Sequence, residues 1–415
     1  MNLLTYLNKK IIQPYVDTFK GLSTEVWWLA LITFINRAGT MVIPFLSLYL
    51  TKHMGFTLSK VGWVMTAFGL GSVLGSWIGG KLTDLVGYYK VMLFSLIGTG
   101  FLFIGLQYLD TFYSICIGVF LVMLVADTFR PAMFVALNAY SKPQNKARSV
   151  TLIRLAINLG FSGGPAIGGL IITKIGYGFL FWIDGVTCVL AAILLVIVLQ
   201  PKASRILDNL IVENPKSVYS DKLFFIFFAA MVLFGFVFLQ YFSTIPLYYK
   251  DVQQLSEYHI GLLMGLNGFL IFVLEMPLIK KLENRNLNIV GLMIFGAALM
   301  GGSLLILNFS NWVGIVVFGM VLMTIGEMIL FPFSNAFVMQ RAKGGKQGEY
   351  MGLYTVSFSI AHIFGHNMGL QFVDNVGYEN TWYIMTVLTL GCLLLLYWLK
   401  VVARQERLVK LEFPD

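Results

Sequence analysis

The stretch QPKASRILDNLIVENPKSVYSDK, residues 200–222, is a long polar segment in the middle of an otherwise apolar chain. It carries two prolines and charges of both signs, and six apolar runs precede it while six follow it. Each run has about 20 residues or more, the length that an α-helix needs to cross a hydrocarbon core. The runs lie near residues 25–50, 61–82, 91–109, 112–138, 148–174, 179–199, 223–249, 260–281, 288–308, 311–339, 350–372 and 381–402.

The composition agrees with a membrane protein. Of the 415 residues, 58% are hydrophobic and 12% are charged, whereas soluble domains have about 25% charged residues. Barrel strands would alternate over about 10 residues, and these runs are continuous. The sequence therefore predicts an all-α membrane protein with twelve transmembrane helices in two six-helix bundles, residues 25–199 and 223–402, joined by a cytoplasmic linker at 200–222.

The distribution of positive charge predicts the orientation. If the N-terminus is cytoplasmic, 22 of the 29 lysines and arginines fall on that side, and only Lys52, Lys60, Lys174 and Lys250 fall on the other. Cytoplasmic loops carry such an excess, so both termini are expected in the cytoplasm. The net charge of +9 is then explained by topology, and no nucleic-acid partner is expected.

The two ends of the chain are expected to be short extramembrane segments. Residues 1–24 include an apolar stripe over 3–19 that is typical of a helix on the membrane surface, with a mobile tail as the alternative. Residues 403–415 form a cytoplasmic tail. No cleavage site of small residues follows a short apolar core, so no signal peptide is expected.

A loop motif gives the first resemblance to a known family. Residues 79–90 read GGKLTDLVGYYK, and the KL of this loop recurs 200 positions later in KKLENR, residues 280–285. Such an echo is expected of a duplicated transporter. The loop resembles the one after the second span of the major facilitator superfamily at Gly80, Asp84, Gly87 and Lys90, although the bases usual near 85–89 are missing. We expect Gly80 to let two helices approach closely and Asp84 to accept from a helix N-terminus or pair with a base, a contact that can hold one gate state. A topogenic turn is the simpler alternative.

A glycine-rich stretch in the fifth run gives a narrower resemblance. Residues 158–169 read NLGFSGGPAIGG, and glycines spaced by four residues form a smooth stripe along which helices pack closely in a bilayer. The pattern resembles the fifth-span signature of drug/proton antiporters, which implies export driven by proton entry. A generic packing seam is the alternative. The matching positions are Gly160, Gly164, Pro165, Gly168 and Gly169.

Four polar or charged residues in the first half are candidates for the transport site. A charge at the bilayer centre is costly and marks function by default, and Arg37 and Asp127 fall at mid-depth. Asp127 and Arg130 are three residues apart, so we expect them on one helix face as an ion pair. Arg130 also fits an arginine that the family links to proton coupling. Arg37, beside Asn36, is expected to meet Asp127 or an anionic group of a substrate.

The second half supplies the other candidates. Glu327 has no base nearby along its run, so its carboxyl can take up a proton near neutral pH. His362 can share that proton, and His366 lies on the same helix face. Two histidines do not make a metal site, so no metal is expected. Glu275 lies nearer the cytoplasm, and we expect it to pair with Lys280 or to act in the gate.

Together these features predict a transporter of the cytoplasmic membrane that is bacterial and monomeric. The expected function is proton-coupled efflux of small hydrophobic or amphiphilic compounds by alternating access. The alternative is a proton-coupled symporter that imports a small solute such as a peptide or a sugar. A receptor or scaffold would need no acids at mid-depth in both halves. No hydrolase or nucleotide motif occurs, so neither an enzyme nor a cofactor other than the proton is expected.

Overall fold

The computed structural model describes residues 21–412 apart from 143–144, 203–216, 284, 286, 311 and 343–346. Helices dominate, and no strand occurs within these ranges. The first half contains α3 (Thr24–Ala38), α4 (Val42–Leu48), η2 (Tyr49–His53), α5 (Leu58–Val86), α6 (Tyr88–Leu106), α7 (Phe112–Ala126), α8 (Phe129–Tyr140), α9 (Lys146–Lys174) and α10 (Gly178–Val198). The second contains η4 (Val218–Ser220), α11 (Lys222–Asp251), α12 (Glu257–Glu283), α13 (Ile289–Leu305), η5 (Ile306–Asn308), α14 (Val313–Arg341) and α15 (Gln347–Glu412). The surface helix expected over residues 3–19 lies outside the described part.

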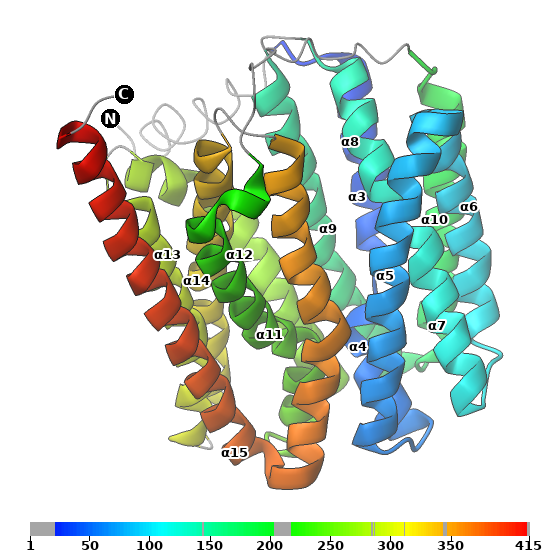
Figure 1. The fold of residues 1–415 in the computed structure, drawn as a ribbon. Coiled ribbons are helices and arrows are strands. Elements are labelled where there is room, and N and C mark those ends of the chain that lie inside the picture. The colour runs from blue at the N-terminus through cyan, green and yellow to red at the C-terminus, as the bar shows by residue number, and fades with distance from the viewer. Residues whose placement is uncertain are drawn as a thin grey trace, which may run out of the picture.

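The apolar runs became helices, with one difference. Eleven helical segments of the described chain are long and apolar enough to cross a membrane, and ten of them match ten of the expected runs to within a few residues. The eleventh, Glu349–Arg404, takes in the last two runs. The loop expected between these runs is helical except at Gly377, whose φ of 80° is a left-handed value that suits glycine. Figure 1 shows α15 reversing its direction in this region.

The helices run roughly side by side in two groups (Figure 1). We call the end of the bundle where α10 ends and α11 begins the linker face, and the opposite end, where α4 meets α5 and α11 meets α12, the far face. The two halves meet where α9 packs on α12, where α5 packs on α15 and where α4 packs on α11. Spans 1 and 4 are each interrupted, at residues 39–41 and 127–128.

Glycines allow the two halves to touch along equivalent seams. A Cβ at Gly69 of α5 would lie 2.5 Å from the backbone oxygen of His362 on α15. A Cβ at Gly268 of α12 would lie 2.6 Å from the backbone nitrogen of Ser162 on α9. Gly268 follows Gly69 by 199 positions, so the echo between the halves in sequence is matched by two equivalent backbone contacts. Backbones this close gain dispersion contacts that larger residues would prevent.

A buried carboxylate joins three helices of the second half at the linker face. Asp221 caps α11 by accepting a hydrogen bond from the amide of Phe224, at 3.2 Å. Arg341, at the end of α14, donates to both of its oxygens at 2.6 and 2.8 Å, and the hydroxyl of Tyr350 on α15 donates at 2.9 Å. Burial raises the pKa of Asp221, but these donors and the arginine charge outweigh burial and hold the pKa below its ordinary value.

We expect the Asp221→Asn substitution to lower the free energy of unfolding by about 1–3 kcal/mol, because the hydrogen bonds from Arg341 and Tyr350 lose a charged acceptor. A lowered carboxyl pKa stabilises the folded protein above the unfolded-state value, and this stabilisation is lost as the pH falls through the folded-state value. Thermal unfolding in detergent should therefore show the difference between wild type and variant at neutral pH. The difference should shrink as the pH falls below about 4. Equal stability at neutral pH would contradict this role.

Candidate functional site

Glu327 lies halfway along α14, and neutral groups surround its carboxyl. The amide nitrogen of Asn267 on α12 donates to Glu327 Oε2 at 2.9 Å and also reaches Thr324 Oγ1 at 3.1 Å. Within the described ranges no lysine or arginine forms an ion pair with this carboxyl. An acid held only by an amide can lose or gain a proton without breaking a salt bridge, which fits the expected proton carrier.

An aromatic cluster lies one helical turn from Glu327. Phe331 follows it by four residues on the same face of α14. The ring of Phe331 lies 5.1 Å from that of Phe238 on α11 and 5.4 Å from that of Phe358 on α15. These three side chains are only partly buried. Partly exposed rings beside a carboxyl can bind an apolar or cationic molecule by stacking and cation–π attraction.

Asp127 occupies the interruption between α7 and α8, where it acts as the C-cap of α7. Its carboxyl accepts a hydrogen bond from the hydroxyl of Ser72 on α5. The ion pair expected with Arg130 is not formed: the break in the helix changes the geometry that a spacing of three residues would have in a regular helix. Arg130 is exposed and stays within electrostatic range of both Asp127 and His362.

Arg37 lies near the end of α3, beside the interruption in span 1. Its guanidinium stands 5.7 Å from the ring centre of Phe161, and its buried Nε has no hydrogen-bond partner in the described part. It lies within electrostatic range of Asp127, but the two form no ion pair there. The Asn36 amide instead donates to Cys188 Sγ on α10, at 3.5 Å.

The two histidines of α15 lie together at the seam between the halves. The rings of His362 and His366 are 5.5 Å apart, and both are close to Phe68 of α5. Both ring nitrogens of His366 are buried without a partner among the described atoms. No group of three or more potential metal ligands was found in the same part of the chain.

Glu275 connects the two halves, which the sequence did not predict. Arg154 of α9 forms an ion pair with Glu275 Oε1, and the amide of Asn158 lies 3.4 Å from Oε2. Glu275 is 5% exposed. The expected pairing with Lys280 is therefore replaced by a partner 121 positions away in the other half, because α9 packs directly on α12.

The loop after α5 differs in detail from the expectation. The close helix approach expected at Gly80 is made by Gly79, where a Cβ would lie 2.5 Å from Thr128 Cα; no atom lies within 4 Å of a Cβ at Gly80. Gly87 has a φ of 87° and makes the turn into α6. Asp84 and Lys90 are exposed at this turn. The gating role of the loop stays a prediction.

The glycine stripe of α9 packs against the interrupted span 1. A Cβ at Gly160 would lie 2.7 Å from Arg37 Cβ, one at Gly164 would lie 2.9 Å from Ala38 O, and one at Gly168 would lie 3.2 Å from Met41 Cβ. Next to the stripe, Gly169 and Pro165 touch the backbone of α12. The signature residues thus bring α9 against one helix of each half.

We expect the Gly164→Leu substitution to separate α9 from α3 and to reduce transport strongly or make the protein leak. Overpacking of this kind costs about 1–3 kcal/mol. Gly163→Leu is the matched control, because no atom lies within 4 Å of a Cβ at Gly163. Proton leak and substrate flux in proteoliposomes would measure both variants. Equal behaviour of the two would contradict the role of the seam.

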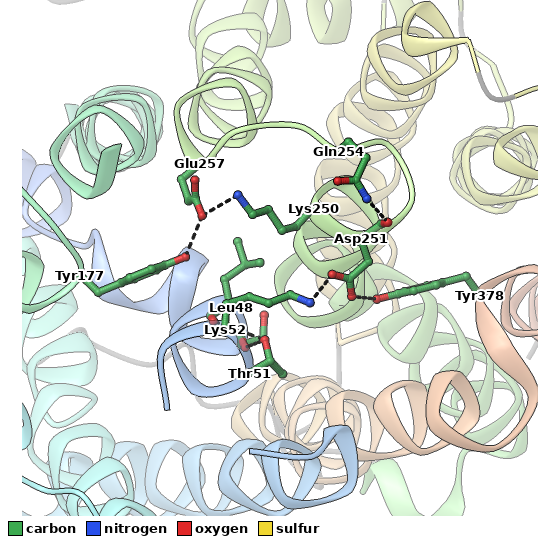
Figure 2. A network of polar contacts seen from close by, with 10 residues as sticks. Leu48, Thr51, Lys52, Tyr177, Lys250, Asp251, Gln254, Glu257 and Tyr378 are labelled. Atoms are coloured by element: carbon green, nitrogen blue, oxygen red, sulfur yellow. Dashed lines mark hydrogen bonds and ion pairs between the residues drawn. The ribbon is translucent and has the colours of Figure 1, made fainter. Parts of the chain in front are cut away.

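At the far face a network of ion pairs and hydrogen bonds crosses between the halves (Figure 2). Lys52, at the end of span 1, pairs with Asp251 at the end of α11, and the Tyr378 hydroxyl donates to the same carboxylate at 3.0 Å. Beside it, Lys250 Nζ lies 2.8 Å from Glu257 Oε1, to which the hydroxyl of Tyr177 donates at 3.2 Å. We call these residues the far-face latch.

Comparisons with known proteins agree with this architecture. YqjV of Bacillus subtilis (strain 168), an uncharacterised MFS-type transporter, is 28% identical over 402 residues, which is 94% of this chain and 96% of YqjV. A Na(+), Li(+), K(+)/H(+) antiporter of Planococcus maritimus is 18% identical over 80% of this chain and 85% of its own. The fold matches that of a peptide transporter POT crystallised with sulfate, with a TM-score of 0.79 and 16% identity over 93% of this chain and 96% of that one.

A mutant of the nucleoside transporter NupG has the same fold with a TM-score of 0.74, at 11% identity over 90% of this chain and 99% of that one. Relatives and structures of this kind are transporters, and no enzyme activity is indicated. The family model of the Major Facilitator Superfamily matches residues 29–366 and 292–415. With a match over most of its length, this chain is a multi-pass membrane transporter that belongs to the Major Facilitator Superfamily.

Proposed function

We propose that the protein is a proton-coupled antiporter that exports small hydrophobic or amphiphilic compounds. The observation that carries this proposal is the surroundings of Glu327. Its carboxyl has only neutral hydrogen-bond partners within the described ranges, and one turn along α14 stands the partly exposed ring of Phe331, which packs against Phe238 and Phe358. A proton and an apolar or cationic substrate can then compete for the same site at Glu327, and such competition is the requirement for antiport.

We also propose that the chain crosses the bilayer twelve times, in bundles over residues 25–199 and 223–402. The two arms of α15 would each cross once, on either side of Gly377. With the linker face in the cytoplasm, the excess of lysine and arginine lies inside, as the positive-inside rule requires. The bacterial relative is consistent with the cytoplasmic membrane, and a monomer would contain every residue of the proposed site.

The proposed cycle uses the two halves as rocking bundles. In this structure the far-face latch joins the halves, so the site would open toward the linker face. Substrate entering from the cytoplasm would displace the proton on Glu327 or Asp127, and protonation from outside would release the substrate. One proton moving across 100 mV supplies about 2.3 kcal/mol, which is sufficient to bias a two-state equilibrium by roughly 50-fold.

Reconstituted protein can test the proposal directly. Proteoliposomes with an acidic interior would receive ethidium, tetraphenylphosphonium or a dipeptide from outside while a dye reports internal pH. Antiport is expected to dissipate the gradient as a hydrophobic cation enters. If a compound dissipates the gradient only when loaded inside, it leaves together with protons and symport is indicated. A rate of substrate transport that does not depend on the pH gradient would contradict proton coupling.

Symport of a small solute is the second candidate, and one observation favours it. Arg37 and Arg130 form no ion pair in the described part, so they could hold an anionic group of a substrate. Protonation of Asp127 would strengthen such binding, because a nearby negative charge is removed. Proton and anion would then bind together, which is the requirement for cotransport, and the fold shared with a peptide transporter is compatible with this alternative.

A further inference from the structure

Asp184 of α10 is an acid that the sequence analysis did not single out. It lies six residues into α10 and is 1% exposed. Its carboxylate accepts hydrogen bonds from the backbone amide of Met41, at 2.9 and 3.1 Å, and from that of Val42, at 2.9 Å. These amides begin α4 and have no partner inside that helix. The Met41 amide also reaches Gly39 O at 2.9 Å, so Asp184 adds acceptors for these two amides where the interruption of span 1 removes the regular helical bonds.

Other groups on the same face of α10 hold the interruption in place. Gly39 packs against the side chain of Thr187, where a Cβ would lie 2.7 Å from Thr187 Cβ. The Asn36 amide reaches Cys188 one turn beyond Asp184. A break in a helix at membrane depth is tolerated where neighbouring protein satisfies the backbone. Cys188 contacts the chain before the break and Thr187 contacts its first residue, whereas Asp184 bonds to its last residue and to the first residue of α4.

The segment beyond the break, residues 42–53, forms the outer arm of span 1. It consists of α4 followed by η2, a short stretch of π-helix. The arm packs on α11 of the other half, and its tip carries Lys52, which pairs with Asp251 in the far-face latch (Figure 2). One end of the arm is thus bonded to its own half, and the other end is bonded to the opposite half.

We propose that Asp184 is a positioning residue for the transport cycle: it fixes the start of the outer arm, and through the arm it places Lys52 for closure of the far face. Opening toward the far face requires the Lys52–Asp251 pair to separate, whereas the bonds from Asp184 stay within one half and serve as the pivot. Loss of Asp184 would free the first turn of α4, and the arm would no longer hold Lys52 against Asp251.

Distances across the far face can test the proposal without a substrate or a proton gradient. Spin labels at Asp110→Cys and Glu379→Cys would report the separation of the halves, because both residues are exposed near far-face turns. Cys116 and Cys392 would be replaced by alanine in this background. Wild type is expected to show mainly the short distance. Lys52→Met is expected to raise the ratio of long to short distances by up to about fivefold, the range for an ion pair whose side chains are 40% and 29% exposed.

Asp184→Leu should raise this ratio as much as Lys52→Met, and the double variant should add little because both changes act through one arm. Asp184→Asn keeps one acceptor oxygen, so we expect an intermediate ratio; it also serves as the test if the leucine variant does not fold. Val186→Ala is the control on α10, because Val186 is 45% exposed, and it should leave the ratio unchanged. A folded Asp184→Asn protein with the wild-type ratio, or full additivity with Lys52→Met, would overturn the proposal.

Discussion

Replacing Glu327 with glutamine is expected to abolish proton-driven accumulation of substrate while the protein stays folded. Glutamine has nearly the same shape and can still accept a hydrogen bond from Asn267, which lies 2.9 Å from Oε2 in the wild type. It cannot take up or release a proton, so the gradient has no group through which to act. Accumulation should fall by roughly 50-fold, the factor that one proton supplies at 100 mV.

Two flux measurements distinguish a variant that has lost proton coupling from one that no longer binds substrate. In the Glu327→Gln variant, exchange of labelled for unlabelled substrate without a gradient should continue, whereas gradient-driven uptake should cease. Asp127→Asn is expected to act in the same way from the first half, where the carboxyl is bonded to Ser72. Asp374→Asn is the matched control, because Asp374 is an exposed carboxyl on α15. If the Glu327→Gln and Asp127→Asn variants both showed full gradient-driven uptake, these two acids would be ruled out as the proton carriers.

The sequence predicted the helices well because span length depends on local composition. Ten apolar runs became ten helical segments of nearly the expected extent, two of them interrupted. The connection expected at 373–380 is shorter in the structure, because hydropathy locates the apolar part of a span and not the end of its helix. Polar residues continue α15 on both sides of Gly377, which alone leaves the helical conformation.

The contacts of the site were harder to predict, since they depend on which helices pack together. Nothing local to Glu275 identifies Arg154, 121 positions away, as its partner. The pairing expected between Asp127 and Arg130 assumed a regular helix, but span 4 is interrupted at that point. A signal for Asp184 did exist: the acid has no base near it in an apolar run, and the Gly39–Thr40 pair in span 1 marks a weak point in a helix that would need a polar partner.

Breaking the ion pair between Arg154 and Glu275 should alter both stability and the pH dependence of transport. Glu275 is 5% exposed and belongs to α12, whereas Arg154 belongs to α9 in the other half. Removing one partner of such a pair leaves the other charge without compensation. We expect Arg154→Gln to lower the unfolding temperature measurably, and Glu275→Gln to lower it less because the Arg154 side chain is 40% exposed. The double variant should recover part of the loss, because two amides can bond to each other without charge.

The two single variants should differ in the direction of their pH effect. Both residues lie within electrostatic range of Glu327. Glu275→Gln leaves the arginine charge uncompensated, which favours an ionised Glu327 and should move the pH profile of coupled transport to lower pH. Arg154→Gln leaves a second negative charge and should move the profile to higher pH. Gradient-driven uptake measured across a pH series would show both shifts.

A second ion pair of the chain provides the control for these shifts. Lys202 and Glu25 lie 2.5 Å apart, but this pair joins the first bundle only to the start of the linker, and the side chains are 50% and 30% exposed. Exposed pairs contribute about 0–1 kcal/mol, so Glu25→Gln should change neither the unfolding temperature nor the pH profile appreciably. If Arg154→Gln and Glu275→Gln shift the profile in the same direction, the effect is a general loss of packing between α9 and α12. Opposite shifts require that the charges themselves act on Glu327, and this would connect the seam between the halves to the group that carries the proton.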